Sequence, residues 1–447
     1  MGSLSKKITH RTARVGVIGL GYVGLPLALA CVKAGFPTIG VELNAKKVQD
    51  LNGGRSYIED ISDADLAQHV QSGGLRATTD YEVLRDVDVI FICVPTPYTV
   101  QRAPDLTDVT RATESIASRL QAGQLVVLQS TTYPGTTTEV VQPILEEGSG
   151  FKAGQDFYLA FSPERIDPGN KQWSAYNTPK VVGGLTDEST ALAAAFLRQM
   201  GAHVHEVSSP GTAEFTKLLE NTFRAVNIAL VNELALLSER MDIDFWEVIE
   251  AAKTKPFGFM PFYPGAGVGG HCIPIDPYYL LWKAREYDFY TRFIELAAET
   301  NETMPYHVVD LVTRGLSCQG KSLCEAKVLV LGVAFKSDIG DARNSPAERV
   351  IELLMRRGAE VRYHDPFVPT FHVGQDAFLQ EGTVLESVPL NAEAITTSDV
   401  VVVVTGHHAV DYAAVLEQAP LVVDSCNVTN GLSGKASVIR LGAPLFC

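Results

Sequence analysis

The chain has 447 residues, of which 46% are hydrophobic, so we expect a globular protein of two or three domains. Its formal net charge of -15 argues against a general nucleic-acid binder, because a phosphate backbone requires a basic surface. Residues 1–14 lack an apolar signal segment, no apolar run reaches bilayer-spanning length, and the seven cysteines are scattered, so we expect a cytoplasmic protein with no membrane partner and no disulfide framework.

A phosphate-binding turn is predicted near the N-terminus. Residues 14–34 follow a strand, turn and helix pattern whose turn contains Gly19, Gly21 and Gly24. Glycines allow the backbone to turn sharply and approach a pyrophosphate, whose charge then lies at the positive end of the helix. The next strand, residues 38–41, ends in Glu42, at the distance where an acid accepts hydrogen bonds from the adenosine ribose and repels a 2′-phosphate. This pattern predicts a βαβ unit that binds NAD rather than NADP.

Three further apolar strands are predicted, and each ends in a polar loop. Doubly wound sheets bind their ligands at the carboxyl ends of their strands, so these loops are candidate binding segments. For any one loop alone, a hydroxyl-rich turn or a surface ion pair remains an alternative. The strands are expected over residues 87–94, 125–129 and 157–161, and the loops are Pro95-Thr96-Pro97, Ser130-Thr131-Thr132 and Ser162-Pro163-Glu164-Arg165.

A long helix is predicted over residues 210–241, where apolar residues recur at three- and four-residue spacing. The helix exceeds the usual length in globular proteins, so we expect it to join two domains and to form the middle of a homodimer interface. Lys217 and Asn221 lie four residues apart and share one face near its start. Most helical lysines are solvated, so the pair alone does not establish a site.

The segment Gly-Gly-His-Cys-Ile-Pro-Ile-Asp-Pro, residues 269–277, is a candidate site for covalent catalysis. It sets Cys272 in a glycine-rich turn and places Asp276 shortly after it. Nearby positive charge or backbone donors lower the pKa of such a thiol and make it a nucleophile. Free cysteines are also common small core residues, so the segment alone leaves both interpretations open. We expect a helical stretch over residues 278–315 and a linker over residues 316–326 to follow.

A second, smaller doubly wound sheet is predicted in the C-terminal part. It lacks the glycine pattern of the first, and residues 335–338 stand in that place, so we expect Lys336 and Arg343 to hold a different phosphate ligand. Cys318 and Cys324 have no second pair to complete a zinc site, so no metal is expected. The predicted elements are strands over residues 327–332, 400–404 and 421–423, a strand that reaches Tyr363, and a helix from the capping box at residues 345–348 to near Gly358.

Six motifs occur in the order typical of the nucleotide-sugar 6-dehydrogenases, and the chain resembles this family over nearly its whole length. They are VGVIGLGYVGLPLA, STTYPGTT, SPERIDPGN, KLLENTFRAVN, GVGGHCIPIDPYYL and GVAFKSDIGDARNSPA. Relatives that act on UDP-glucose or GDP-mannose usually have serine before the cysteine and lysine before the aspartate, whereas this chain has His271 and Ile275. It therefore resembles the branch that oxidises UDP-N-acetylglucosamine, with UDP-N-acetylmannosamine and UDP-glucose as alternatives.

The expected fold is α/β, with two doubly wound Rossmann-like domains joined by a long central helix. Residues 1–209 are expected to form the NAD-binding domain. Residues 210–315 are expected to form the central helical region for dimerisation and catalysis, and residues 316–447 the UDP-sugar-binding domain.

The resemblance implies a four-electron oxidation of the sugar 6-hydroxyl to the uronate, in which two NAD each accept one hydride and the product serves surface polysaccharide. Cys272 is expected to hold the aldehyde stage as a thiohemiacetal and then as a thioester that water opens. Lys217 and Asn221 are expected to steady the developing oxyanion, and Lys217 also to accept the first proton. The implied set is completed by Asp276 and Glu164, which assist thioester hydrolysis, and by Thr131 on the nicotinamide side.

The family pattern also implies the binding residues. Those expected to bind NAD are Gly19, Gly21, Tyr22, Val23, Gly24, Glu42, Lys47, Pro95, Thr96, Ser130 and Thr131. Those expected to bind the UDP-sugar are Glu164, Arg165, Lys217, Asn221, Phe262, Tyr263, Gly267, Lys336 and Arg343. Two positions depart from the family. Pro256 stands where many relatives have an arginine, and Lys253 or Lys255 is the available substitute. The segment at residues 424–427 lacks the arginine that relatives often have there.

Two other classes of function share parts of this pattern. A single-step hydroxyacid dehydrogenase of the 6-phosphogluconate type has a similar N-terminal fold and central helix and uses a lysine and an asparagine, but it needs no cysteine. A sensor of NAD or nucleotide-sugar would keep the fold without the chemistry. Full turnover by a Cys272→Ala variant would favour the first alternative, and binding of UDP-sugars without turnover would favour the second.

Overall fold

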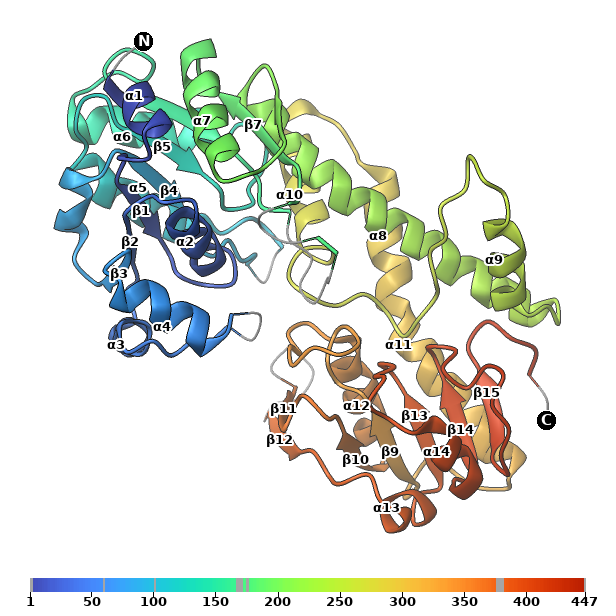
Figure 1. Ribbon diagram of the computed structural model, residues 1–447. Coiled ribbons are helices and arrows are strands. Elements are labelled where there is room, and N and C mark those ends of the chain that lie inside the picture. The colour runs from blue at the N-terminus through green and yellow to red at the C-terminus, as the bar shows by residue number, and fades with distance from the viewer. Residues whose placement is uncertain are drawn as a thin grey trace. The chain divides into compact units, whose positions relative to one another are not determined.

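The computed structural model describes residues 3–58, 61–99, 102–165, 172–173, 177–374 and 382–445. The chain divides into two units, which we call unit 1 and unit 2. Unit 1 comprises Met1–Glu220 and Tyr278–Phe289, and unit 2 comprises Asn221–Pro277 and Tyr290–Cys447. Figure 1 labels most of their helices and strands. The predicted three-part division at residues 209 and 315 stays a prediction.

Unit 1 contains an eight-stranded sheet of β1 (Val15–Ile18), β2 (Thr38–Val41), β3 (Leu75–Thr78), β4 (Val89–Ile92), β5 (Leu125–Leu128), β6 (Tyr158–Phe161), β7 (Lys180–Gly184) and β8 (Val204–Glu206). Their order is β3-β2-β1-β4-β5-β6-β7-β8. Neighbouring strands are parallel from β3 to β6, β7 runs antiparallel to β6, and β8 runs parallel to β7. This is the predicted doubly wound arrangement, in which the chain turns from one half of the sheet to the other beside β1.

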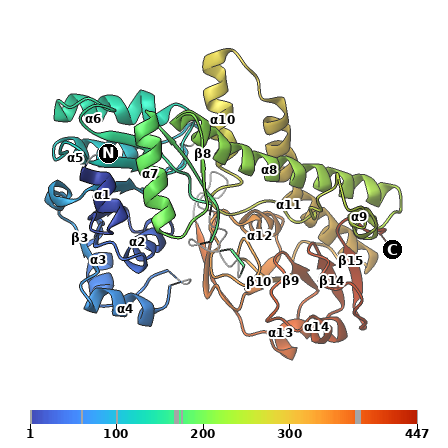
Figure 2. The same ribbon diagram turned by 45° about the horizontal axis from the view of Figure 1, so that its top comes forward.

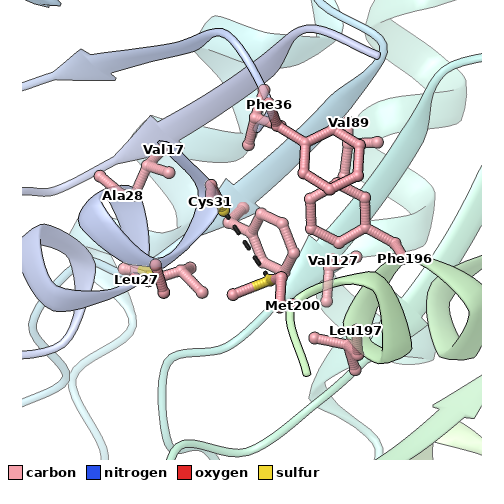
Figure 3. Close-up of a cluster of buried hydrophobic side chains, with 14 of the residues drawn as sticks. Val17, Leu27, Ala28, Cys31, Phe36, Val89, Val127, Phe196, Leu197 and Met200 are labelled. Carbon is pink, nitrogen blue, oxygen red and sulfur yellow. Dashed lines mark hydrogen bonds between the residues drawn. The ribbon is translucent and has the colours of Figure 1, made fainter. Parts of the chain in front are cut away.

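Helices cover both faces of this sheet because successive strand residues point to opposite sides. Val89 and Phe91 of β4 belong to one buried cluster, together with residues of α2 (Gly24–Lys33) and α7 (Asp187–Gln199). Ile90 and Ile92 point to the other face and belong to a second cluster. In the first cluster, Phe196 packs on Phe36 with ring centroids 4.7 Å apart (Figure 3). The helices are α2 (Gly24–Lys33), α5 (Thr107–Ala117), α6 (Gln142–Ser149) and α7 (Asp187–Gln199), and unit 1 also contains α1 (Ser3–Thr9), α3 (Ala45–Asn52) and α4 (Asp63–Gln71) (Figure 2).

The predicted long helix is α8 (Pro210–Arg240), which begins in unit 1 and continues in unit 2. A shorter helix, α9 (Phe245–Lys253), follows it in unit 2, and Asp244 caps its N-terminus by accepting a hydrogen bond from the Trp246 N–H. Among the described residues, no helix combines the length and apolar character needed to cross a bilayer.

The helical stretch predicted over residues 278–315 is wrong as a single element. It is divided into α10 (Asp276–Ala284) and α11 (Arg292–Cys318). Between them a short 3-10 turn ends at Asp288, whose left-handed φ of 52° stops the helix. Because α11 extends to Cys318, the first residues of the predicted linker at 316–326 are helical.

Unit 2 contains the predicted second sheet, with the order β10-β9-β13-β14-β15. Its strands are β9 (Lys327–Leu331), β10 (Glu360–His364), β13 (Val400–Val403), β14 (Leu421–Asp424) and β15 (Ser437–Arg440), and all neighbouring pairs are parallel. The predicted capped helix is α12 (Pro346–Arg356), where Ser345 accepts from the Ala347 N–H. A two-stranded antiparallel sheet of β11 (Thr370–Val373) and β12 (Thr383–Glu386) was not predicted.

The cysteines differ in state. Cys31, Cys93, Cys272, Cys324 and Cys426 are free thiols. Cys318 is disulfide-bonded, which the scattered cysteine pattern did not predict.

Candidate active site

The first and third glycines of the phosphate turn are required by packing, whereas the second faces open space. A Cβ atom on Gly19, whose φ is 84°, would lie 2.7 Å from the carbonyl oxygen of Cys93. A Cβ on Gly24, at the start of α2, would lie 1.8 Å from the Gly19 carbonyl oxygen. At Gly21 an added Cβ meets no described atom within 4 Å. The turn therefore presents open backbone at a helix N-terminus, which fits the pyrophosphate of a dinucleotide.

Glu42 lies at the end of β2, beside this turn. Its carboxylate oxygens accept hydrogen bonds from the backbone N–H groups of Leu20 (3.2 Å) and Asn44 (3.1 Å). Tyr57, which sequence reasoning missed, donates to the Leu20 carbonyl oxygen at 2.6 Å, and the Lys47 ammonium lies 4.9 Å from its ring centroid. Burial, together with the charge of Glu42, raises the pKa of Tyr57, so the phenol stays a donor. The carboxylate is thus fixed where it fits a ribose hydroxyl.

The ends of β4 and β5 are tied to each other and to α10. The Ser130 hydroxyl donates to the Val94 carbonyl oxygen at 2.7 Å. The buried Tyr279 of α10 donates a hydrogen bond to the carbonyl oxygen of Thr96. The same hydroxyl lies 3.3 Å from the carbonyl oxygen of Pro97. These bonds fix the loops that follow β4 and β5 at the carboxyl edge of the sheet, where the sequence predicts the cofactor.

Glu164 follows β6 and is buried in an ion pair. The Lys180 ammonium lies 2.8 Å from both of its carboxylate oxygens, and the side chains are 9% and 2% exposed for the glutamate and the lysine. The Gln129 amide donates to Oε2 at 2.8 Å, and the Arg165 N–H donates to Oε1 at 2.7 Å. Sequence reasoning missed Lys180. The arrangement holds Glu164 as a fixed anion whose two oxygens are engaged by donors.

The start of α8 is anchored on two sides, which fixes the buried Lys217. Arg165 forms a fork with Glu220, with N–O distances of 2.5 and 3.2 Å. Glu214 accepts from the Thr137 N–H at 2.9 Å and from its hydroxyl at 2.6 Å. Burial raises the pKa of Glu214, although these hydrogen bonds oppose the shift. Lys217 lies between the two anchored acids and is itself buried.

In unit 2, Cys272 is exposed in a tight turn. The N–H groups of Ile275 and Asp276 both donate to the Cys272 carbonyl oxygen, at 3.1 and 2.8 Å. Asp276 begins α10 and is buried, and its Oδ2 accepts from the Asn221 amide at 2.5 Å. The structure therefore joins the predicted acid and the predicted amide directly, four residues after the thiol.

The cysteine turn packs against residues 335–344, which we call the β9 loop because they follow β9. The Gly270 N–H donates to the Arg343 carbonyl oxygen at 3.2 Å, and the Asn344 amide donates to the Gly270 carbonyl oxygen at 3.1 Å. The His271 ring packs edge-on against Phe335, with centroids 5.8 Å apart. Both sides of the turn are therefore held by the same loop.

The β9 loop also carries the two predicted phosphate-binding cations. Arg343 is half-exposed and forms a fork on Asp341, with distances of 3.0 Å from Nε and 2.7 Å from Nη2. Lys336 is partly buried. The loop lies at the carboxyl edge of a parallel sheet and leads into the N-terminus of α12, and both positions favour anions.

The segment at residues 262–267 is held within unit 2 by aromatic and backbone contacts. Phe262 packs edge-on against Phe223 at 5.7 Å, and Tyr263 stacks on Trp246 at 6.0 Å. Gly267 has a φ of 136°, and a Cβ there would lie 3.0 Å from the Cβ of Pro346. The backbone at this point fits closely against the start of α12.

A buried amide chain supports the same segment. The Asn232 side chain accepts from the Gly265 N–H at 3.0 Å and donates to Asn301 at 2.9 Å. Asn301 in turn donates to the Ala225 carbonyl oxygen at 3.1 Å. Sequence reasoning missed this chain, because asparagines in helices usually face solvent.

The two positions that depart from the family have identifiable surroundings. Lys253 pairs with Glu250 at 3.0 Å on α9. Arg440 of β15 donates to Asn427 at 2.8 Å and to Asp244 at 2.6 Å, so an arginine from a later strand reaches the segment at residues 424–427.

The predicted residues are distributed over both units. Unit 1 contains the predicted NAD-binding residues together with Thr131, Glu164, Arg165 and Lys217. Unit 2 contains Asn221, Phe262, Tyr263, Gly267, Cys272, Asp276, Lys336 and Arg343. Their individual roles stay predictions.

Three consecutive family models match the chain, all from the UDP-glucose/GDP-mannose dehydrogenase family. The NAD binding domain matches residues 13–201, the central domain residues 211–303 and the UDP binding domain residues 329–431.

Individual relatives span most of the chain. A UDP-N-acetyl-D-glucosamine 6-dehydrogenase of Pseudomonas aeruginosa is 38% identical over 356 residues, which cover 79% of this chain and 83% of that protein. A UDP-N-acetyl-D-mannosamine dehydrogenase of Pyrococcus horikoshii is 38% identical over 360 residues, which cover 80% and 85%. The solved structure of a UDP-D-ManNAc dehydrogenase from Pyrococcus horikoshii has a TM-score of 0.86 and 32% identity and covers 96% of this chain and 99% of that chain.

Proposed function

The chain belongs to the NAD-dependent UDP-glucose/GDP-mannose dehydrogenase family, and from this premise we propose that it oxidises the 6-hydroxyl of UDP-N-acetylglucosamine to the uronate. The observation that carries the proposal is the exposed Cys272 in a turn whose Asp276 is hydrogen-bonded to Asn221. His271 and Ile275 support the acetamido-sugar branch. The relative named for N-acetyl-D-glucosamine and the one named for N-acetyl-D-mannosamine each share 38% sequence identity with this chain. UDP-N-acetylmannosamine is therefore the first alternative substrate and UDP-glucose the second.

The proposed chemistry passes through a covalent intermediate on Cys272. NAD, when bound, would supply the hydride acceptor for the two oxidation steps, with a fresh NAD for each step. The Cys272 thiolate forms a bond to the aldehyde carbon and gives a thiohemiacetal, whose oxidation leaves a thioester. Water then adds to the thioester carbon, the C–S bond breaks, and the carboxylate leaves while the thiolate is restored. One water and two NAD are consumed for each uronate formed.

Other predicted site residues divide the remaining tasks. An asparagine amide has two N–H donors, so Asn221 can hold Asp276 with one and stabilise an oxyanion with the other. We assign Lys217 to the oxyanion and to the first hydroxyl proton, and Asp276 to orientation of the hydrolytic water. Thr131 belongs to the nicotinamide side. Glu164 enters as a fixed negative charge, because donors engage both of its oxygens.

The test is the stoichiometry of NADH formation with purified protein. UDP-N-acetylglucosamine should give two NADH for each uronate, and Cys272→Ala should abolish uronate formation. One NADH per sugar with full turnover by the Cys272→Ala variant would favour a single-step dehydrogenase. Binding of each UDP-sugar without turnover would favour a sensor. A panel that adds UDP-N-acetylmannosamine and UDP-glucose decides among the three substrates by their relative kcat/KM values.

We further propose that the protein is a homodimer through α8. Leu219, Leu230 and Leu237 of this helix are 57%, 53% and 50% exposed, which is unusual for leucines spaced along one long helix. A second copy of the same helix has the apolar chemistry and the length to cover them.

A further inference from the structure

One carboxylate of the β9 loop, Asp341, is shared between two basic side chains. Its oxygens accept the fork of Arg343 at 3.0 and 2.7 Å, and its Oδ2 lies 3.4 Å from Nε2 of His271. The side chain of Asp341 is 15% exposed, whereas that of Arg343 is 49% exposed. The arginine is therefore the partner that an incoming anion can reach, and the histidine is the partner on the side of the cysteine turn.

The same loop packs closely against the backbone of the cysteine turn. Besides the hydrogen bonds of Gly270 to Arg343 and Asn344, a Cβ on Gly269 would lie 2.8 Å from the Asn344 carbonyl oxygen. A Cβ on Gly270 would lie 2.9 Å from the ring of Phe335. A rearrangement of the side chains on this loop therefore shifts the residues that precede Cys272.

Two charged groups of the β9 loop, Arg343 and Asp341, act on His271. Burial lowers the pKa of His271, the guanidinium of Arg343 lowers it further, and the carboxylate of Asp341 raises it. The other acid of the β9 loop, Asp338, instead faces His408, with its Oδ2 at 2.5 Å from Nδ1. The Arg343 guanidinium therefore favours the neutral form of His271, and release of Asp341 from Arg343 favours the protonated form.

We propose that Asp341 and His271 are positioning residues that link the binding of the substrate's diphosphate at Arg343 to activation of the Cys272 thiol. The inference rests on the proposed function, because it requires a nucleoside diphosphate as the anion. The diphosphate takes the fork of Arg343, Asp341 turns its charge to His271, and the imidazole binds a proton from solvent. Cys272 directly follows His271 in the chain, so positive charge on the imidazole favours the Cys272 thiolate, and the thiol loses its proton to solvent. The nucleophile thus becomes reactive when substrate is bound.

The test measures alkylation of Cys272 by iodoacetamide in the full-length protein, with and without UDP. UDP supplies the diphosphate but lacks the sugar, so it leaves the thiol open to the reagent. Peptide mass spectrometry separates Cys272 from the exposed Cys324, and isothermal titration measures UDP binding in the same samples. In the wild type, UDP should shift the midpoint of the pH–rate profile down by about one unit, which is roughly a tenfold faster reaction near neutral pH.

Two variants should lose this shift while they still bind UDP. Asp341→Asn removes the carboxylate that is released, and His271→Gln removes the group that gains the proton and serves if the first variant folds poorly. Asp338→Asn is the matched control, because it removes the same charge from the same loop region but faces His408. The control should keep both UDP binding and the shift.

The outcomes separate the inference from the proposed function. Absence of UDP binding, or binding unaffected by Arg343→Ala, overturns both. Binding that depends on Arg343 without a shift in the wild type overturns the inference alone. An unchanged shift in Asp341→Asn or in His271→Gln also overturns the inference alone.

Discussion

The ion pair of Lys180 with Glu164 gives the sharpest test of how the site is built. Replacement of Lys180 by methionine keeps the volume but leaves a carboxylate that is 9% exposed without its counter-charge. Removal of one partner of a buried pair costs about 3–5 kcal/mol, because the remaining charge stays desolvated. Gln129 and the Arg165 N–H still donate to that carboxylate, so we expect the lower end of this range.

The assay is thermal unfolding followed by circular dichroism. For a unit of this size, a loss of about 3 kcal/mol lowers the Tm by roughly 6–12 °C. The double variant Lys180→Met, Glu164→Gln should recover most of the loss, because neither residue then carries a charge. Lys152→Met is the control, because it breaks a pair with Glu146 whose lysine side chain is 63% exposed, and the Tm should change little. A Lys180→Met variant with the Tm of the wild type would refute the role given to this pair.

Three other predictions follow from particular contacts. Gly24→Ala should unfold or strongly destabilise unit 1, because its Cβ would lie 1.8 Å from a backbone oxygen, whereas Gly21→Ala should leave the Tm unchanged and weaken NAD binding measured by titration calorimetry. The pKa of Glu214 in the folded state is raised above 4.5, so between 4.5 and the folded-state pKa the folded protein binds more protons than the unfolded chain. The free energy of unfolding therefore falls as pH rises through this window. Glu214→Gln should remove that fall in denaturant titrations at successive pH values, and an unchanged dependence on pH would contradict the prediction. If the proposed homodimer forms through α8, Leu230→Glu with Leu237→Glu should make the protein a monomer in light scattering, while Val384→Glu, at an equally exposed apolar residue of β12, should not. A dimeric double variant would exclude α8 as the interface.

The sequence predicts well those features that depend on residues close together in the chain. The predicted strand at residues 38–41 coincides with β2, because an apolar run lies between Pro37 and the acidic Glu42. The requirement for glycine at Gly19 and Gly24 is likewise visible in the spacing of the turn. In both cases local backbone chemistry decides the structure.

Features that depend on distant residues could not be predicted. Lys180 lies 16 residues after Glu164, at the start of an apolar strand, and no pattern marks the two as partners. The break between α10 and α11 occurs at Asp288, a non-glycine residue with positive φ, so neither glycine nor proline signals it. Arg440 and Asn427 meet only because β15 lies beside β14 in the sheet. Pairing of this kind is set by the tertiary fold.

The exposure of Cys272 also makes the protein sensitive to oxidants. A solvent-accessible thiol reacts with peroxide through its thiolate to give the sulfenic acid, and further oxidation is irreversible. Burial raises the pKa of the Cys31 and Cys93 thiols well above the ordinary value, and both are withdrawn from solvent, so they do not compete for the reagent. Handling without reductant should therefore cost activity in proportion to the fraction of Cys272 oxidised, long before the fold itself is affected.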